Sequence, residues 1–322
     1  MPATSLRDVF SRIKDKPLVR PAYLRWKRGQ FLSPDGYCAY FGIFDSFAAA
    51  RAWLPPNPEF DHAPLAAPYL NEVSKKVFPY DYPVMRWLER ALDLGATSVL
   101  DIGGSVGVHY YAYQPYIDMP PALSWHVIEV PAMVAIGREL AASTGAAALT
   151  FSDRLDEAIA ARAYDIWISA GAIQYMEQGR PDQMLQKSRL RPNHILLNKI
   201  PLYDGPDFVT TQNIGNGAYT PVHVYNGARF VADIEALGYV LRDRWEVPDR
   251  SLHVPGHAER TCPHFAGLYF ARDTCARQLV TPVEPPGHRA AARETLFSCQ
   301  QQLSHFLKPV LEAAGDDMKD TG

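Results

Sequence analysis

Residues 99–111, VLDIGGSVGVHYY, decide the fold of this 322-residue chain. An apolar run typical of a buried strand contains Asp101, and a glycine-rich turn then leads into residues with helical spacing. Glycine has no Cβ, so this turn allows the backbone to approach a ligand closely. The glycines are Gly103, Gly104 and Gly107, with Ser105 between them. The stretch therefore predicts a strand, a ligand-binding turn and a helix in succession.

The same alternation of strand, turn and helix continues from residue 97 to about residue 273. Apolar runs predict strands at residues 97–102, 125–130, 148–153, 164–170, 194–200, 239–246 and 264–272. Helical spacing predicts helices at residues 106–117, 132–143 and 230–237. Strands that alternate with helices favour an α/β fold with a doubly wound, mostly parallel, Rossmann-like sheet.

The chain before and after this region has a different pattern. Prolines recur in the first 95 residues and predict short helices, at residues 46–54 and 84–94, separated by turns. The segment YCAYFGIFDSF, residues 37–47, is rich in aromatic residues. We therefore expect an aromatic, helical N-terminal cap over residues 1–95, a catalytic domain over residues 96–275, and a C-terminal extension over residues 276–322 with a helix at residues 289–314.

Composition excludes several classes of protein. The 32 Lys and Arg residues nearly balance the 35 Asp and Glu residues, which argues against binding to nucleic acid or anionic membranes. The N-terminus carries charges where a signal peptide needs apolar residues, and no apolar run is long enough to span a membrane. Four cysteines without a C-x-x-C pattern predict free thiols. We expect a soluble, cytoplasmic protein with a small-molecule ligand, and leave a homodimer open.

Two acids at successive strand ends indicate the ligand. Asp101 precedes the glycine turn and would repel a phosphate but attract an ammonium group, and Glu129 follows 28 residues later, where a carboxylate can accept both ribose hydroxyls. Ser105 replaces the second glycine of the dinucleotide pattern G-x-G-x-x-G. These features describe S-adenosylmethionine better than NAD. The alternative is an ordinary turn with surface acids.

Four longer blocks extend this interpretation to a family. They are residues 100–117, 125–140, 165–177 and 194–204. With the segment GIFDSFAAA, residues 42–50, they resemble the class I S-adenosylmethionine-dependent methyltransferases, and more narrowly a bacterial family of putative methyltransferases that includes the azetidine-2-carboxylate synthases. The resemblance covers most of the chain up to about residue 273. It implies the Rossmann-like fold with S-adenosylmethionine as methyl donor or as substrate.

The resemblance also implies roles for individual residues. Asp101 and the turn up to Gly107 would bind the amino acid portion of the cofactor, and Glu129 its ribose. Asp153 would bind the adenine amino group, or would instead cap the following helix. The segment from Ser169 to Tyr175 would face the reacting end.

Catalytic candidates are less sharply defined by the sequence. Tyr175 would place a ring or hydroxyl beside the sulfonium, Asn198 would orient a polar group, and Tyr110 would share a helical face with Tyr113. The cap residues Tyr37, Tyr40 and Phe41 would close over the site. For each ring the alternative is packing in the core, and for Asn198 it is satisfying a strand end.

Three further features complete the sequence-based expectations. His109 beside the turn would act as a base or lie on the surface. Residues 210–223, polar in composition, predict a flexible loop on the substrate side. His253, His257 and His264 lie on a proline-broken segment without a fixed acid partner, so no metal site is expected.

Three functions remain open at this point. The first is cyclisation of S-adenosylmethionine to azetidine-2-carboxylate with release of methylthioadenosine, which needs a dry site and no acceptor pocket. The second is methyl transfer to a small molecule, for which no residue stands out as the base. The third is a non-catalytic binding platform, which intact glycines and both acids argue against. A tyrosine-rich cap without an evident acceptor base favours cyclisation.

Overall fold

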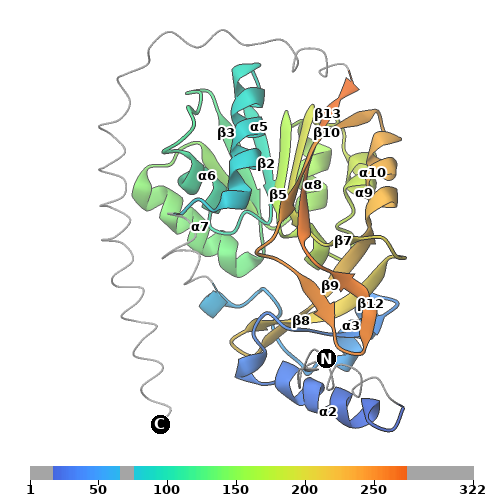
Figure 1. Ribbon diagram of the computed structural model, residues 1–322. Coiled ribbons are helices and arrows are strands. Elements are labelled where there is room, and N and C mark those ends of the chain that lie inside the picture. Colours follow the sequence, from blue (N-terminus) through green and yellow to red (C-terminus); the bar gives the residue numbers. More distant parts are fainter. Residues whose placement is uncertain (1–16, 66–75, 274–322) are drawn as a thin grey trace, which may run out of the picture.

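The computed structural model describes residues 17–65 and 76–273 (Figure 1). The expected C-terminal helix at residues 289–314, together with Cys275 and Cys299, lies outside the described residues.

A seven-stranded sheet forms the centre of the molecule, in the order β10-β13-β6-β5-β2-β3-β4. All neighbouring strands from β6 to β4 are parallel, whereas β13 is antiparallel to both β6 and β10. Their bounds are β2 Ser98–Ile102, β3 Ser124–Ile128, β4 Leu149–Ser152, β5 Ile166–Ala170, β6 His194–Ile200, β10 Tyr239–Val247 and β13 Phe265–Arg272. Each lies within about two residues of its predicted range, because strands covered on both faces read as apolar runs. The predicted α/β fold class, a doubly wound, mostly parallel, Rossmann-like sheet, is confirmed.

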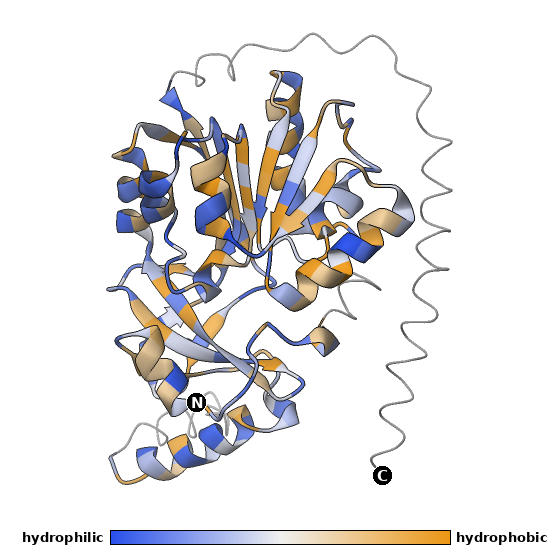
Figure 2. Cartoon of the chain, turned by 180° about the vertical axis from the view of Figure 1, so that it is seen from behind, coloured by the Kyte–Doolittle hydropathy of each residue, from blue (hydrophilic) through white to orange (hydrophobic). Residues whose placement is uncertain are grey.

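Helices cover both faces of this sheet (Figure 1). Helices α5 (Tyr82–Asp93), α6 (Val108–Tyr113) and α7 (Pro131–Thr144) share a hydrophobic cluster with one face. The opposite face packs against α8 (Leu155–Ala161), α9 (Pro181–Lys187) and α10 (Gly227–Glu235). Figure 2 shows apolar residues along the strands between these two helical layers. The core is therefore split by the sheet into two halves.

Helix α5 belongs to the large sheet although it precedes residue 95. The Trp87 ring stacks on Tyr269 of β13 with 4.4 Å between centroids, and its Nε1 donates a hydrogen bond of 2.7 Å to Asp243 of β10. The division expected at residue 95 therefore separates a helix from the sheet that it covers. Proline spacing alone did not reveal this contact, because its partners lie more than 150 residues later.

A second, four-stranded sheet has the order β1-β8-β9-β7 and lies beside the carboxyl ends of the parallel strands (Figure 1). It joins β1 (Tyr40–Phe44) to β7 (Leu202–Tyr203), β8 (Phe208–Gly215) and β9 (Ala218–Asn226). Helices α2 (Arg20–Phe31) and α3 (Phe47–Trp53) flank it, and a small ribbon is formed by β11 (Leu252–Val254) and β12 (His257–Cys262). The aromatic cap is thus partly a sheet, and three of the four strands of that sheet come from residues 202–226.

The prediction of a flexible loop at residues 210–223 is wrong, because these residues form the hairpin of β8 and β9. Their polar side chains are buried and bonded to distant backbone. Thr211 Oγ1 donates to the carbonyl of Phe41 at 2.6 Å, and Asn213 Nδ2 donates to that of Phe31 at 2.7 Å. A polar strand of this kind resembles a loop in sequence until its partner strand is known.

In the part of the chain that the structure describes, four short 3₁₀ turns connect these elements: η1 (Pro34–Gly36), η2 (Ala63–Leu65), η4 (Pro79–Asp81) and η5 (Ile173–Tyr175). Within the described ranges, no helix has the length and apolar character needed to cross a membrane.

Candidate functional site

The strand order reverses at β2, which lies between β3 and β5. From β2 the chain builds β3 and β4 on one side and then returns to build β5 and β6 on the other. Connections diverge at such a point, so ligands of doubly wound sheets bind there, outside the carboxyl ends of the strands. The predicted site residues lie in the last three residues of β2, β5 and β6, in the segments that follow β2, β3, β4 and β5, or in the cap.

Three residues of the glycine turn after β2 have left-handed backbone. Gly103, Ser105 and Gly107 have φ angles of +74°, +52° and +93°. The N–H groups of Gly107 and Val108 both donate to the carbonyl of Gly104, at 3.0 Å each, and Ser105 N–H donates to Glu129 Oε1 at 3.0 Å. The N–H of Gly103 donates to the carbonyl of Ile128 at 2.8 Å, so four N–H groups of the turn, those of Gly103, Ser105, Gly107 and Val108, donate within the protein.

Asp101 lies beneath this turn and has no exposed surface. Its carboxylate accepts a hydrogen bond from Trp125 Nε1 at 3.1 Å and lies 2.9 Å from Nδ1 of His109. His109 is itself buried, so its predicted surface position is wrong. The structure thus places the Asp101 carboxylate in the interior, in a pair with His109, and not at the surface of the turn.

Two of the glycines are required by neighbouring protein atoms. A Cβ on Gly104 would lie 2.4 Å from the Asp101 carboxylate carbon, and one on Gly103 would lie 2.0 Å from Cβ of Ala172. The sequence analysis explained these glycines by the approach of a ligand. The structure adds that the buried carboxylate and the segment after β5 occupy the space that side chains would need.

Glu129 follows β3 and closes the other side of the turn. Its Oε1 accepts from Ser105 N–H and its Oε2 from Val130 N–H at 2.9 Å. Burial raises the pKa of Glu129, and the two backbone hydrogen bonds oppose this rise. Each carboxylate oxygen keeps a second lone pair, so Glu129 can still accept two hydrogen bonds from a ligand.

Asp153 follows β4 and is exposed. It does not cap α8, since Arg154 occupies the N-cap position and no side chain caps that helix. Asp153 lines a depression of about 450 Å³ together with residues that follow η5, among them Met176 and Gln178. Of the two predicted roles, the helix cap is therefore wrong and the ligand contact stays a prediction.

Ser169 lies near the end of β5, and Tyr175 lies in the segment after it. Ser169 is buried and its Oγ donates to the carbonyl of Ile102 at 2.8 Å, which ties β5 to β2. Tyr175 is half-buried, donates its hydroxyl hydrogen to Gln212 Oε1 of β8 at 2.8 Å, and meets the Phe60 ring edge-on at 4.9 Å. Tyr175 therefore joins the two sheets at the reacting end of the predicted site.

Two of the predicted catalytic residues occupy structural positions. The Asn198 side chain donates to the carbonyl of Tyr80 at 3.0 Å and accepts from Trp245 Nε1 at 3.1 Å and from the following N–H. Tyr110 is buried in the hydrophobic cluster and packs edge-on against Trp125, with 5.8 Å between centroids. The alternatives raised for them, a satisfied strand end and core packing, match this geometry.

The three cap rings differ in position. Tyr37 is 66% exposed, whereas Tyr40 is 8% exposed at the start of β1. Burial and the neighbouring Tyr175 raise the pKa of Tyr40, which places these two hydroxyls in one environment. Phe41 stacks on Trp53 at 5.4 Å. Packing within the cap thus accounts for Phe41, and Tyr40 alone of the three is linked to Tyr175.

The structure adds residues that the sequence analysis did not select. Phe60 reaches Tyr175 from the cap, and Asp61 beside it accepts the N–H of Ala132 at the start of α7 at 3.0 Å. Lys199 and Asp81 lie where β6 meets η4. Phe60 and Asp61 follow a proline-rich stretch without periodicity, so no sequence signal identified them.

Among the described residues, six buried side-chain polar atoms lack a hydrogen-bond partner. Two of them, Ser105 Oγ and Gln174 Oε1, lie in the turn and in η5 after β5. Buried polar atoms are normally paired, so an unpaired group beside a turn at the switch point fits a site that awaits a polar ligand.

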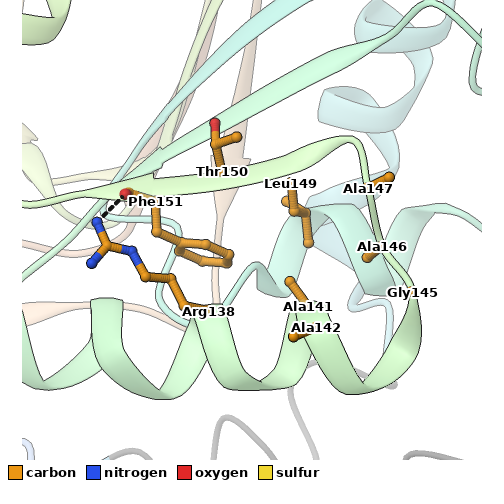
Figure 3. Close-up of a pocket in the computed structure, with 9 residues that line it drawn as sticks. All are labelled: Arg138, Ala141, Ala142, Gly145, Ala146, Ala147, Leu149, Thr150 and Phe151. Atoms are coloured by element: carbon orange, nitrogen blue, oxygen red, sulfur yellow. Dashed lines mark hydrogen bonds between the residues drawn. The ribbon is translucent and has the colours of Figure 1, made fainter.

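A second depression, of about 520 Å³, lies between the end of α7 and β4 (Figure 3). Alanines dominate its lining, and its charged residue Arg138 donates to the carbonyl of Phe151 at 2.7 Å. It therefore offers no group for chemistry. Within the described ranges, no cluster of three or more His, Cys, Asp or Glu side chains is placed to hold a metal ion.

Comparisons with known proteins add the following. No family model and no curated protein sequence matches the chain. The [4+2]-cyclase SpnF is 14% identical, with 73% of this chain and 98% of that chain covered at a TM-score of 0.43. The 1,6-didemethyltoxoflavin N1-methyltransferase of Burkholderia thailandensis, solved with S-adenosylhomocysteine, is also 14% identical, with coverages of 68% and 92% at a TM-score of 0.39. The assignment to a doubly wound, Rossmann-like fold rests on the strand order of this chain.

Proposed function

We propose that this protein is an enzyme that uses S-adenosylmethionine in small-molecule metabolism. The observation that carries the proposal is the turn after β2 together with Glu129, joined by the Ser105–Glu129 hydrogen bond at the point where the strand order reverses. A ribose bound by Glu129 and an amino acid arm along the turn would fill this site.

The hydrogen bonds of the turn argue against a dinucleotide. A pyrophosphate is held by free N–H groups at the start of a helix. Here the N–H groups of Ser105, Gly107 and Val108 already donate within the protein, and α6 is only six residues long and fully buried. A ligand without a phosphate group does not need these N–H groups as hydrogen-bond donors.

The residues present supply specific contacts for this ligand. Ser105 Oγ is the unpaired group on the turn and would bond the amino acid portion, and Asp153 would accept from the adenine amino group. Asp101 would not contact the ligand itself but would hold the turn in place beside Gly104 and through its contact with His109. Bound S-adenosylmethionine supplies a sulfonium, whose attached carbons are open to attack by a nucleophile.

We propose further that the reaction is cyclisation of the aminobutyryl arm to azetidine-2-carboxylate, with release of methylthioadenosine. The support is the ring pair of Tyr175 and Phe60 at the end of β5, since aromatic faces stabilise a cation by about 0.5–2 kcal/mol each when water is excluded. Cyclisation requires no second substrate. Methyl transfer to a small molecule is the alternative, and the two differ in their products.

The test is to incubate the purified protein with S-adenosylmethionine alone and to identify the products by mass spectrometry. Methylthioadenosine with a four-carbon imino acid supports cyclisation. If S-adenosylmethionine binds without turnover, cyclisation is refuted and methyl acceptors are screened for release of S-adenosylhomocysteine. If neither form binds in calorimetry, the proposal as a whole fails.

Tyr175 offers a test at the level of one residue. Tyr175→Ala removes the ring and should lower turnover more than the affinity for S-adenosylhomocysteine, whereas Tyr175→Phe keeps the ring and removes the hydroxyl that donates to Gln212. Equal losses of turnover and affinity in Tyr175→Ala would assign Tyr175 to packing alone. Phe41→Leu, in the Trp53 stack of the cap, serves as the control for a lost ring.

A further inference from the structure

Lys199 ends β6 at the carboxyl edge of the sheet, one strand from the segment that carries Tyr175. Its side chain passes over Gly171, where a Cβ would lie 3.4 Å from Cβ and 3.5 Å from Cε of the lysine. Its carbonyl accepts a hydrogen bond from Gln174 Nε2 at 3.3 Å. The segment after β5 therefore fixes both the backbone and the stem of Lys199.

The backbone of Lys199 is left-handed, with a φ angle of +58°. Residues other than glycine, asparagine and aspartate seldom adopt this conformation, and it persists where the surroundings impose it. Here the preceding Asn198 accepts the N–H of Lys199 at 3.1 Å and is itself anchored on Trp245 and Tyr80. The Asn198 network thus acts to aim the lysine.

The amine at the end of this side chain has aromatic and charged neighbours but no ion pair. Its Nζ lies 5.1 Å from the centre of the Tyr80 ring. Within residues 17–65 and 76–273, no carboxylate lies within ion-pair distance of it. Asp81, the nearest acid on the cap side, is engaged with the N–H of Phe78 at 3.0 Å.

The charges around the amine act in opposite directions. Burial lowers the pKa of Lys199, and Arg250 lowers it further, whereas Asp81 and Asp101 raise it. The net direction is downward, so the neutral amine becomes available at a lower pH than for a lysine in water. A neutral amine can accept a proton, and burial beside a reacting centre is how lysines become bases in enzymes.

We infer that Lys199 is the general base of this site and accepts the proton of the nucleophilic nitrogen of the substrate. The inference rests on the proposed use of S-adenosylmethionine. Lys199 takes one proton from the α-ammonium group and becomes an ammonium itself. The freed nitrogen forms its bond to the γ-carbon as the γ-carbon–sulfur bond breaks, with the electron pair left on sulfur. The ring nitrogen leaves protonated, so charge and atoms balance without a further reactant.

The inference also supplies the base that the sequence analysis did not find. In methyl transfer the same amine would accept the proton of an acceptor's N–H or O–H group. Asn198 then acts as a positioning residue, because its contacts hold Lys199 and not the substrate.

A first experiment measures the amine without turnover. The protein as isolated is treated with acetic anhydride between pH 6 and pH 10, and acetylation of Lys199 is compared by peptide mass spectrometry with that of the exposed Lys187. We expect Lys199 to reach half-maximal reactivity at a lower pH than Lys187, and S-adenosylhomocysteine to protect Lys199. Half-maximal reactivity at the same or a higher pH, or no protection, overturns the inference.

A second experiment separates a base from a mere positive charge. Lys199→Met keeps the stem without the amine, and Lys199→Arg keeps the charge but cannot release its proton. We expect both to lower kcat by about 10²–10⁴-fold, to lose the basic rise in the pH–rate profile, and to bind S-adenosylhomocysteine within about threefold of the parent protein. Lys187→Met, on the exposed end of α9, is the matched control and should keep parental rates.

The outcomes are distinguishable. Full activity in Lys199→Arg would show that Lys199 serves as a cation, and parental kcat in Lys199→Met would remove it from the chemistry; either overturns the inference and leaves the proposed function intact. A parent protein that binds neither S-adenosylmethionine nor S-adenosylhomocysteine refutes the proposed function instead.

Discussion

Gly104→Ala is expected to destabilise the protein through Asp101. Gly104 has a backbone that alanine tolerates, since its φ is not positive, but the added methyl group would lie 2.4 Å from Cγ and Oδ2 of Asp101. The carboxylate must therefore move away from Trp125 Nε1 and His109 Nδ1. A buried carboxylate that loses its hydrogen-bond partners is left uncompensated, which costs about 3–5 kcal/mol. We expect a loss in the free energy of unfolding within this range.

The assay is urea unfolding followed by circular dichroism. With a slope of about 3 kcal/mol/M, a loss of about 3–5 kcal/mol lowers the midpoint by about 1–2 M. Gly29→Ala is the matched control, because Gly29 lies exposed near the end of α2 with no atom within 4 Å of the added Cβ. It should stabilise the protein by about 0.5–1 kcal/mol.

The cause is isolated by repeating Gly104→Ala in an Asp101→Ala background. There the carboxylate is absent, so the methyl group should cost less than about 1 kcal/mol, and the coupling between the two sites should exceed about 2 kcal/mol. A loss below about 1 kcal/mol in the parent, or the same loss in both backgrounds, would refute the claim that Gly104 makes room for Asp101.

Three further predictions concern other parts of the molecule. Glu129→Gln should weaken S-adenosylhomocysteine binding in calorimetry by roughly 10- to 100-fold, because hydrogen bonds to charged groups contribute about 1.5–3 kcal/mol. The control Glu139→Gln, at an exposed position, should leave the affinity unchanged. The same affinity in Glu129→Gln as in the parent protein would remove Glu129 from the site. Burial lowers the pKa of His194 to about 4, below its value of about 6.5 in the unfolded chain. The free energy of unfolding should therefore fall by up to about 3 kcal/mol as the pH decreases from 6.5 toward 4. Urea unfolding at pH 7.5 and 4.5 measures this loss, which should be smaller in His194→Gln; the same loss in the variant and the parent would contradict the prediction. Burial raises the pKa of the Cys262 thiol to about 12, so iodoacetamide at pH 8 should label Cys262 only after unfolding in urea, and labelling of the folded protein would argue against its burial.

The sequence predicted the large sheet because its strands are buried on both faces. The range 194–200 matches β6 residue for residue, since the strand is an apolar run up to Asn198. The hairpin of β8 and β9 was not predicted, because its polar side chains are satisfied by backbone groups about 170 residues earlier in the chain. The local amino-acid composition does not reveal hydrogen-bond partners that lie so far away in the sequence.

The candidate site, like the fold, could be predicted only in part from the sequence. The turn and Glu129 could be identified, since both follow predicted strands directly. The burial of Asp101 could not, because it depends on Trp125 from the next strand and on His109 folding back over it. The left-handed backbone of Lys199 is likewise set by contacts from η4, η5 and β10 that no spacing in the sequence reveals.

The most direct test of the central claim is a calorimetric titration of the purified protein with S-adenosylhomocysteine and, separately, with NAD. The account predicts that S-adenosylhomocysteine binds at one site per chain and that NAD does not bind, because four N–H groups of the turn, those of Gly103, Ser105, Gly107 and Val108, already donate within the protein and are lost to a pyrophosphate. Binding of NAD, or no binding of S-adenosylhomocysteine, would contradict it.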